Sequence, residues 1–146
     1  MSPPTLIIKN LYLGDYGNAS NLFHPLMKEL NISHIINCCK GGQNFFPKYF
    51  NYVNLEWVDN TSQNIFLEDV SFFSVLEYIE NALNRDEVVF VHCGAGISRS
   101  ATVIIAFLMK KFKWSYDEAF VFVKTKKPNI QPNIHFENQL RKLENP

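Results

Sequence analysis

The amino-acid sequence predicts a single α/β domain in which a central, mostly parallel, twisted sheet is flanked by helices on both faces. The segment 88–91 is an unbroken run of Val and Phe, as expected of a strand buried on both faces of a parallel sheet. Apolar residues at helical spacing over 72–83 precede it, and a strand at 50–59 comes before them, so the order predicts a parallel crossover. The 146 residues suit one domain over 1–146 that buries about two thirds of its unfolded surface.

The first part of the chain is expected to supply the remaining strands and one helix. Short β-branched and aromatic runs that end in Gly or Asn clusters predict strands, and apolar residues three and four positions apart predict helices. A proline is compatible with a helix when it occupies the first turn. The predicted elements are one or two strands over 5–14 with a turn at Asn10, a polar loop over 14–20, a helix from His24 to Leu30, and a strand over 34–39.

The last part of the chain is predicted to be helical. The run 101–109 is apolar almost all round, which indicates a buried helix. Ser115 and Glu118 have the spacing of a capping box for the next helix, which must end before Pro128. Asn133 is the predicted N-cap of the last helix. The residues expected on the buried face of that helix are Phe136, Leu140 and Leu143.

Between the buried strand and the buried helix lies a loop with the features of an anion-binding site. The five residues that separate Cys93 from Arg99 are uncharged, and two are glycines, so the loop can curl and turn its backbone N–H groups inward. The helix N-terminus points back at the loop, and the Arg99 guanidinium can pair with two phosphate oxygens at once. The predicted phosphate-binding residues are Gly94, Ala95, Gly96, Ile97, Ser98 and Arg99.

Cys93 is the expected nucleophile of this site. A cysteine beside Arg99 at a helix N-terminus titrates below its usual pKa of about 8.5, which favours the thiolate. Asp59 ends the predicted strand 50–59 at the sheet edge where α/β proteins place reactive groups, so it is the candidate proton donor. A buried structural cysteine beside a surface arginine is the alternative, but the strand, the glycines and the buried helix together favour a phosphatase.

Residues 92–100, His-Cys-Gly-Ala-Gly-Ile-Ser-Arg-Ser, resemble the signature loop of the protein tyrosine phosphatase superfamily, and the run from Ala95 to Thr102 most resembles its dual-specificity branch. Within that branch the chain looks like the small atypical members. One departure is Lys126-Lys127-Pro128, where many relatives have an arginine before the proline. Further matching segments are Leu11-Tyr12-Leu13-Gly14, His34-Ile35-Ile36-Asn37, Pro132-Asn133 and Phe136-Glu137-Asn138-Gln139-Leu140.

This resemblance implies a mechanism without metal or cofactor. Cys93 attacks phosphorus to give a phosphocysteine, while Arg99 binds the phosphate and the transition state. Asp59 protonates the leaving oxygen and later activates water. Ser100 would help the thiolate leave in the second step. Supporting roles fall to His92, which orders the loop and tunes the thiol, and to Asn133, which braces the loop from behind.

The expected partner is a phosphoprotein carrying phosphotyrosine or phosphoserine/phosphothreonine. Inositide-cleaving relatives carry lysines inside the loop, whereas this loop is neutral apart from Arg99. RNA 5′-phosphatase relatives usually continue Arg-Thr-Gly, where this chain has Arg99-Ser100-Ala101. A phosphate-reading binding module and a sulfur-transfer enzyme are the remaining alternatives. The preference between phosphotyrosine and phosphothreonine stays open.

Composition bears on partners and location. The 14 basic and 14 acidic residues cancel, so no global field attracts nucleic acid or an anionic membrane. No secretory signal or membrane-spanning run is evident, so we expect a cytoplasmic or nuclear protein, with a monomer favoured and the oligomeric state left open. The adjacent Cys38 and Cys39 are expected to be buried and not to bind metal. A further hypothesis is that one of them forms a disulfide with oxidised Cys93.

Overall fold

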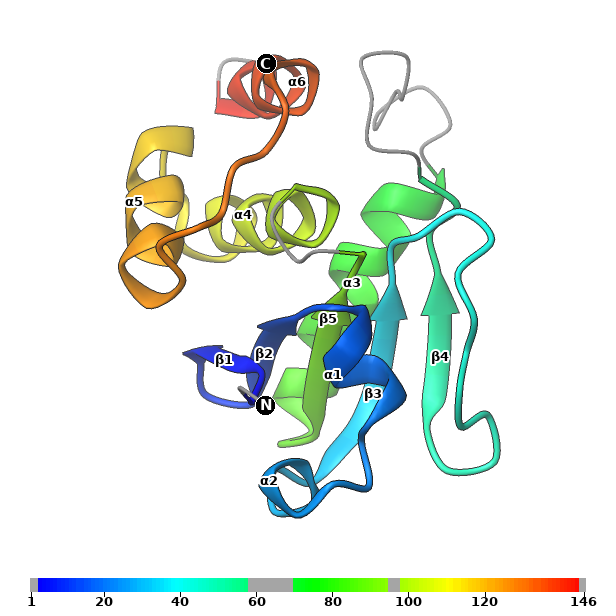
Figure 1. The fold of residues 1–146 in the computed structure, drawn as a ribbon. Coiled ribbons are helices and arrows are strands. Elements are labelled where there is room, and N and C mark those ends of the chain that lie inside the picture. The colour runs from blue at the N-terminus through cyan, green and yellow to red at the C-terminus, as the bar shows by residue number, and fades with distance from the viewer. Residues whose placement is uncertain (1–2, 58–69, 95–97, 145–146) are drawn as a thin grey trace.

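The computed structural model describes residues 3–57, 70–94 and 98–144, and the sheet in this part of the chain has five strands (Figure 1). Their order across the sheet is β1-β2-β5-β3-β4. All neighbouring pairs are parallel except β1 with β2, so the predicted mostly parallel sheet is confirmed. The strands are β1 (Thr5–Ile8), β2 (Leu11–Gly14), β3 (Ile32–Asn37), β4 (Asn51–Asn54) and β5 (Val88–His92).

Helices cover both faces of the sheet, as predicted. Side chains that alternate along a strand point to opposite faces, and Phe90 packs with Ile35, Ala19 and Leu22 on one face, whereas Val89 and Val91 pack on the other. Residues of α3, α4, α5 and α6 belong to this second, larger cluster. The helices are α1 (Tyr16–Ser20), α2 (Pro25–Lys28), α3 (Val70–Asn84), α4 (Arg99–Phe112), α5 (Tyr116–Lys126) and α6 (Ile134–Glu144).

The predictions for the C-terminal helices are confirmed in detail. Helix α4 is buried from Ser100 to Met109 on every side. The hydroxyl of Ser115 accepts the Glu118 N–H at 3.1 Å, and the Glu118 carboxylate accepts the Ser115 N–H at 3.0 Å, which is the predicted capping box. Asn133 Oδ1 accepts the Phe136 N–H at 2.9 Å and so caps α6.

Residues 14–20 were predicted as a polar loop, and this prediction is wrong because the segment contains α1. The Asp15 carboxylate accepts the Asn18 N–H at 2.8 Å, and Asn18 Oδ1 accepts the Asp15 N–H at 3.2 Å. Polar side chains at these positions cap a short helix and do not mark a loop. The Tyr16 N–H then bonds to the Gly94 carbonyl at 3.1 Å, which fixes the helix beside the Cys93 loop.

The other differences concern element ends. The predicted helix from His24 to Leu30 is shorter, and the strand predicted over 34–39 begins and ends two residues earlier. The strand predicted over 50–59 ends at Asn54, because the Trp57 N–H bonds to the Leu55 carbonyl instead of to a neighbouring strand. Leu55 and Trp57 still point into the core as the alternation predicts.

Candidate active site

The candidate site lies at the carboxyl edge of the central strands, where α4 begins. Strand β5 ends at His92 between its parallel neighbours β2 and β3, and Cys93 follows with only 2 % of its surface exposed. The His92 carbonyl accepts the Cys38 N–H at 2.9 Å, which continues the ladder to the point where the loop starts. The sheet therefore fixes the position of the Cys93 backbone from both sides.

The Cys93 thiol and the Ser100 hydroxyl are hydrogen-bonded at 3.2 Å. Ser100 is fully buried in the first turn of α4, a helix of 14 residues. Sulfur thus sits at the N-terminal end of a helix, where the macrodipole favours negative charge. This pairing places a hydroxyl donor next to the sulfur atom of the predicted nucleophile.

Arg99 is held above the start of the loop. Its Nη1 donates to the Trp57 carbonyl at 3.3 Å, and a Cβ added at Gly94 would lie 3.1 Å from Nη2. Glycine at position 94 therefore lets the guanidinium approach the loop backbone closely. Arg99 Nε is buried and has no hydrogen-bond partner within the described part of the chain. A buried donor without a partner is costly, so it fits a site that receives an anion.

Asn133 braces the end of the loop through its backbone. Its N–H donates to the Ser98 hydroxyl at 3.1 Å, while its side chain caps α6. The Ser98 carbonyl accepts the Thr102 hydroxyl at 2.7 Å and the Thr102 N–H at 2.9 Å. Asp59, Ala95, Gly96 and Ile97 lie outside the described residues, so their predicted roles stay predictions.

His92 is a buried neutral side chain under the loop. Its ring stacks on Phe90 with centroids 5.5 Å apart, and Nδ1 lies 3.5 Å from the Cys93 carbonyl. Burial lowers the pKa of His92 to about 4. The imidazole is therefore uncharged at neutral pH, which suits a residue that supports the loop.

This burial predicts a pH-dependent loss of stability. His92 binds a proton at a pKa of 6.5 in the unfolded chain and only near 4 in the folded chain. Its contribution to the free energy of unfolding is therefore fully present above pH 6.5 and is lost as the pH falls toward 4. At about 1.4 kcal/mol per pH unit, the loss is about 3 kcal/mol. Urea unfolding from pH 7.5 to pH 4 is expected to show a shallower pH dependence in His92→Gln than in the wild type. Equal pH dependence in both proteins would contradict the assignment.

The cysteine beside the predicted nucleophile is Cys38. Asn37 pairs with His92 in the parallel register, so Cys38 and Cys93 directly follow the ends of neighbouring strands. Neighbouring strands in a sheet are about 4.8 Å apart, which is within the Cα separation that a disulfide spans. Both belong to the same hydrophobic cluster, and all three cysteines are free thiols. Burial raises the pKa of Cys38, which favours its thiol form.

We therefore expect mild hydrogen peroxide to join Cys93 to Cys38 and not to Cys39. Peroxide converts the Cys93 thiolate to the sulfenic acid, and the Cys38 thiol then forms the disulfide with release of water. Peptide mapping by mass spectrometry identifies the linkage. Persistent sulfenic or sulfinic acid at Cys93, with Cys38 still reduced, would exclude this disulfide.

Within the residues that the structure describes, no helix combines the length and hydropathy needed to cross a bilayer. The same part of the chain contains no group of three or more His, Cys, Asp or Glu side chains arranged to hold a metal ion.

Comparison with known proteins assigns the class of protein that carries this fold and loop. The family model for the dual specificity phosphatase catalytic domain matches residues 11–146. The chain belongs to this family of protein phosphatases, which are hydrolases.

The relatives extend the match over nearly the whole chain. Human dual specificity protein phosphatase 9 is 40% identical over 143 residues, covering 97% of this chain and 36% of that protein. Protein phosphatase Slingshot of Drosophila melanogaster is 39% identical over 142 residues, covering 96% of this chain and 13% of that protein. The chain thus spans well under half the length of these relatives. A solved structure, the human tyrosine phosphatase-like serine/threonine/tyrosine-interacting protein, aligns over 99% of this chain and 97% of its own at 34% identity, with a TM-score of 0.87.

Two features of the site were not predicted from the sequence. The Tyr16 ring packs edge-on against Phe45, with centroids 5.0 Å apart, beside the loop that its backbone contacts. The Trp57 carbonyl holds Arg99, although 42 positions separate the two residues. The Asp15 and Asn18 capping pattern is a signal that could have located Tyr16 on a helix, whereas a backbone carbonyl leaves no trace in the sequence.

Proposed function

We propose that this chain hydrolyses phosphotyrosine and phosphoserine/phosphothreonine monoesters of proteins through a phosphocysteine at Cys93. The observation that carries the proposal is the sulfur of Cys93 at the N-terminus of α4, 3.2 Å from the Ser100 hydroxyl, in a loop that the Arg99 guanidinium approaches closely at Gly94. The buried Arg99 Nε, which lacks a partner in the described part of the chain, supports an anionic ligand at this position.

In the first step the Cys93 thiolate attacks phosphorus in line and forms a sulfur–phosphorus bond. The bond from phosphorus to the substrate oxygen breaks, and Asp59 gives its proton to that oxygen. Arg99 pairs with two of the phosphoryl oxygens, and backbone N–H groups of residues 94–98 bind the remainder. The products of this step are the dephosphorylated protein and the phosphocysteine.

In the second step water attacks the phosphocysteine, and Asp59, now a carboxylate, takes its proton. The phosphorus–sulfur bond breaks and inorganic phosphate leaves. The Ser100 hydroxyl donates a hydrogen bond to the departing thiolate, which it already contacts in this structure. This cycle returns the enzyme to its starting state with no metal or cofactor.

The surroundings of the loop support a phosphoprotein as the substrate. The Tyr16 backbone bonds to the Gly94 carbonyl, and its ring packs edge-on against Phe45. Such an aromatic pair beside the loop can contact a phosphotyrosine ring. The zero net charge gives no support for inositide or RNA substrates. For location we propose the cytoplasm or nucleus, where the thiolate stays reduced. A monomer remains our working assignment.

We expect phosphate release from both a phosphotyrosine peptide and a phosphothreonine peptide when EDTA is present. A higher rate on the phosphotyrosine peptide than on the phosphothreonine peptide would support the Tyr16 and Phe45 rings as a substrate contact. Tyr16→Ala is then expected to raise KM for phosphotyrosine peptide about tenfold and to change phosphothreonine hydrolysis less. Release from neither peptide, with turnover of a phosphoinositide or an RNA 5′-phosphate, would contradict the assigned substrate class.

A further inference from the structure

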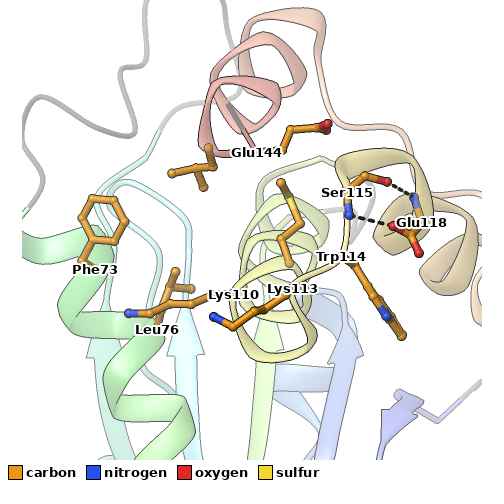
Figure 2. Close-up of a pocket in the computed structure, with 10 residues that line it drawn as sticks. Phe73, Leu76, Lys110, Lys113, Trp114, Ser115, Glu118 and Glu144 are labelled. Atoms are coloured by element: carbon orange, nitrogen blue, oxygen red, sulfur yellow. Dashed lines mark hydrogen bonds between the residues drawn. The ribbon is translucent and has the colours of Figure 1, made fainter. Parts of the chain in front are cut away.

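Discrimination between phosphotyrosine and phosphothreonine has to arise beside the Cys93 loop. A cavity of about 580 Å³ at the other end of α4 is lined by lysines and glutamates together, so its charge favours neither an acidic nor a basic ligand (Figure 2). Arg99 begins α4, and Met109 at the cavity is ten residues later, about 15 Å along the axis. A phosphorylated side chain bound at Cys93 does not extend that far.

A buried amide lies close to the Cys93 loop, at the carboxyl end of β3. Asn37 is fully buried, and it pairs with His92 of β5 in the parallel register. Its backbone carbonyl accepts the Leu55 N–H at 2.8 Å. The proposed chemistry gives no role to its side chain. Because a buried amide needs hydrogen-bond partners for its oxygen and its nitrogen, those partners show what the residue holds in place.

The segment 38–44 folds around the Asn37 side chain. Asn37 Oδ1 accepts the Cys39 N–H at 3.1 Å, and Asn37 Nδ2 donates to Asn44 Oδ1 at 3.1 Å. A Cβ added at Gly42 would lie 2.9 Å from Asn37 Oδ1, so glycine at this position lets the backbone approach the amide closely. The amide therefore connects the first and last parts of the segment, which we call the 38–44 loop.

The 38–44 loop also contacts the residue that holds the phosphate-binding arginine. The Lys40 N–H donates to the Trp57 carbonyl at 2.9 Å. The same carbonyl accepts Arg99 Nη1 at 3.3 Å. One backbone oxygen thus joins the loop to the guanidinium, which places the loop at the edge of the candidate active site.

Phe45 directly follows the 38–44 loop and is the ring that Tyr16 contacts. The two ring centroids are 5.0 Å apart and the ring planes make an angle of 73°, which is an edge-on contact. The Tyr16 N–H is bonded to the Gly94 carbonyl at 3.1 Å. Phe45 packs against the core cluster on this face of the sheet, and the Asn37–Asn44 hydrogen bond fixes the backbone from which it projects.

We propose that Asn37 is a positioning residue that sets the preference for phosphotyrosine, because it fixes the loop that holds Phe45 against Tyr16. Asn37 acts through the aromatic pair and touches neither the substrate nor the reacting atoms. This inference rests on the proposed function, since it assigns the specificity of the same site. A phosphotyrosine ring can contact the aromatic pair, whereas phosphoserine and phosphothreonine have no ring to do so. A displaced loop therefore weakens binding of phosphotyrosine selectively.

The variant that tests this role is Asn44→Ala. Asn44 is only partly buried, so its truncation breaks the contact with Asn37 from the loop side and leaves the buried amide in the fold. KM for the phosphotyrosine peptide is expected to rise about fivefold, with kcat on both peptides and KM for the phosphothreonine peptide nearly unchanged. Damage to the fold or to the catalytic groups would instead lower kcat on both peptides. Asn37→Ala should show the same selectivity with a larger rise in KM.

Asn54→Ala is the matched control. Asn54 pairs with Asn37 in the parallel register of β3 and β4, and its side chain is exposed. The same amide group is therefore removed from the neighbouring strand, outside the 38–44 loop. We expect KM for both peptides to stay within about twofold of the wild-type value.

The position of the two rings can be measured without turnover. Nuclear Overhauser effects between the ring protons of Tyr16 and Phe45 are expected in the wild-type protein and should be strongly weakened in Asn44→Ala. A double variant gives a second check. When Phe45→Leu has already removed the ring, the further change Asn44→Ala should alter KM for the phosphotyrosine peptide by less than about twofold.

Three outcomes would overturn the role of Asn37. They are unchanged contacts between the Tyr16 and Phe45 rings in Asn44→Ala, an equal change of KM on both peptides, and additive effects of Asn44→Ala and Phe45→Leu. A wild-type protein that releases no phosphate from either peptide, while Asn44→Ala still loses the ring contacts, would refute the proposed function and confirm that Asn37 positions the aromatic pair.

Discussion

Replacing Cys93 with Ser is expected to lower phosphate release from the phosphotyrosine peptide by about 10⁴-fold or more. A serine hydroxyl at this position stays protonated at neutral pH, so the attacking thiolate is lost while the buried volume hardly changes. Inorganic phosphate released per enzyme, measured with excess peptide, gives the ratio of the two rates. The circular dichroism spectrum and melting temperature should remain close to those of the wild type.

Cys39→Ser is the matched control for this experiment. Cys39 is 8 % exposed and lies near the same loop, so the same change of sulfur to oxygen is made beside the site. We expect Cys39→Ser to keep activity within about threefold of the wild type, because the residue takes no part in the proposed chemistry. Comparable losses in both variants would indicate damage to the fold and not removal of a nucleophile.

Replacing Asp59 with Asn is expected to lower turnover by about 10²- to 10⁴-fold, because the leaving oxygen then receives no proton from a side chain. The nucleophile must be deprotonated and the general acid protonated, so wild-type activity should follow a bell centred on mildly acidic pH. The variant should lose the limb on the high-pH side, where the carboxyl group ionises. Steady-state kinetics from pH 4.5 to pH 8.5 give both results.

Glu56→Gln separates this role from that of a neighbouring acid. The Glu56 carboxylate accepts the Gly41 N–H at 3.0 Å on the exposed side of the chain, so we expect the variant to keep both limbs of the pH profile. If Asp59→Asn retains the full rate, the general acid is instead Glu56, Glu68 or Asp69. Loss of the high-pH limb in one of those variants would then identify it.

The sequence was sufficient to predict those parts of the fold where one physical preference dominates. The apolar run of β5 and the all-round apolar run of α4 could each be buried in only one way, and both occur where predicted. The capping box at Ser115 is a local pattern that needs no tertiary context. These features also place Cys93 and Arg99 on either side of the loop, which is why the candidate site could be predicted.

Features that depend on distant backbone groups could not be predicted in this way. Helix α1 was missed because Asp15 and Asn18 are typical of loops as well as of caps, and its contact with Gly94 joins segments 78 residues apart. The predicted strand over 50–59 was too long because apolar residues continue to alternate as far as Trp57, although strand β4 ends at Asn54. Which of Cys38 and Cys39 follows the strand beside Cys93 in register depends on the parallel pairing of β3 with β5, which the sequence does not specify.

The most direct test of the proposed chemistry is detection of the covalent intermediate. Ser100→Ala should slow release of the thiolate, so phosphoenzyme accumulates when the reaction with phosphotyrosine peptide is quenched within milliseconds. Mass spectrometry of the digested protein is expected to find one phosphoryl group on the peptide that contains Cys93, and none in Cys93→Ser. Continued release of phosphate with no phosphorylated Cys93, or with the phosphoryl group on another residue, would contradict a phosphocysteine mechanism.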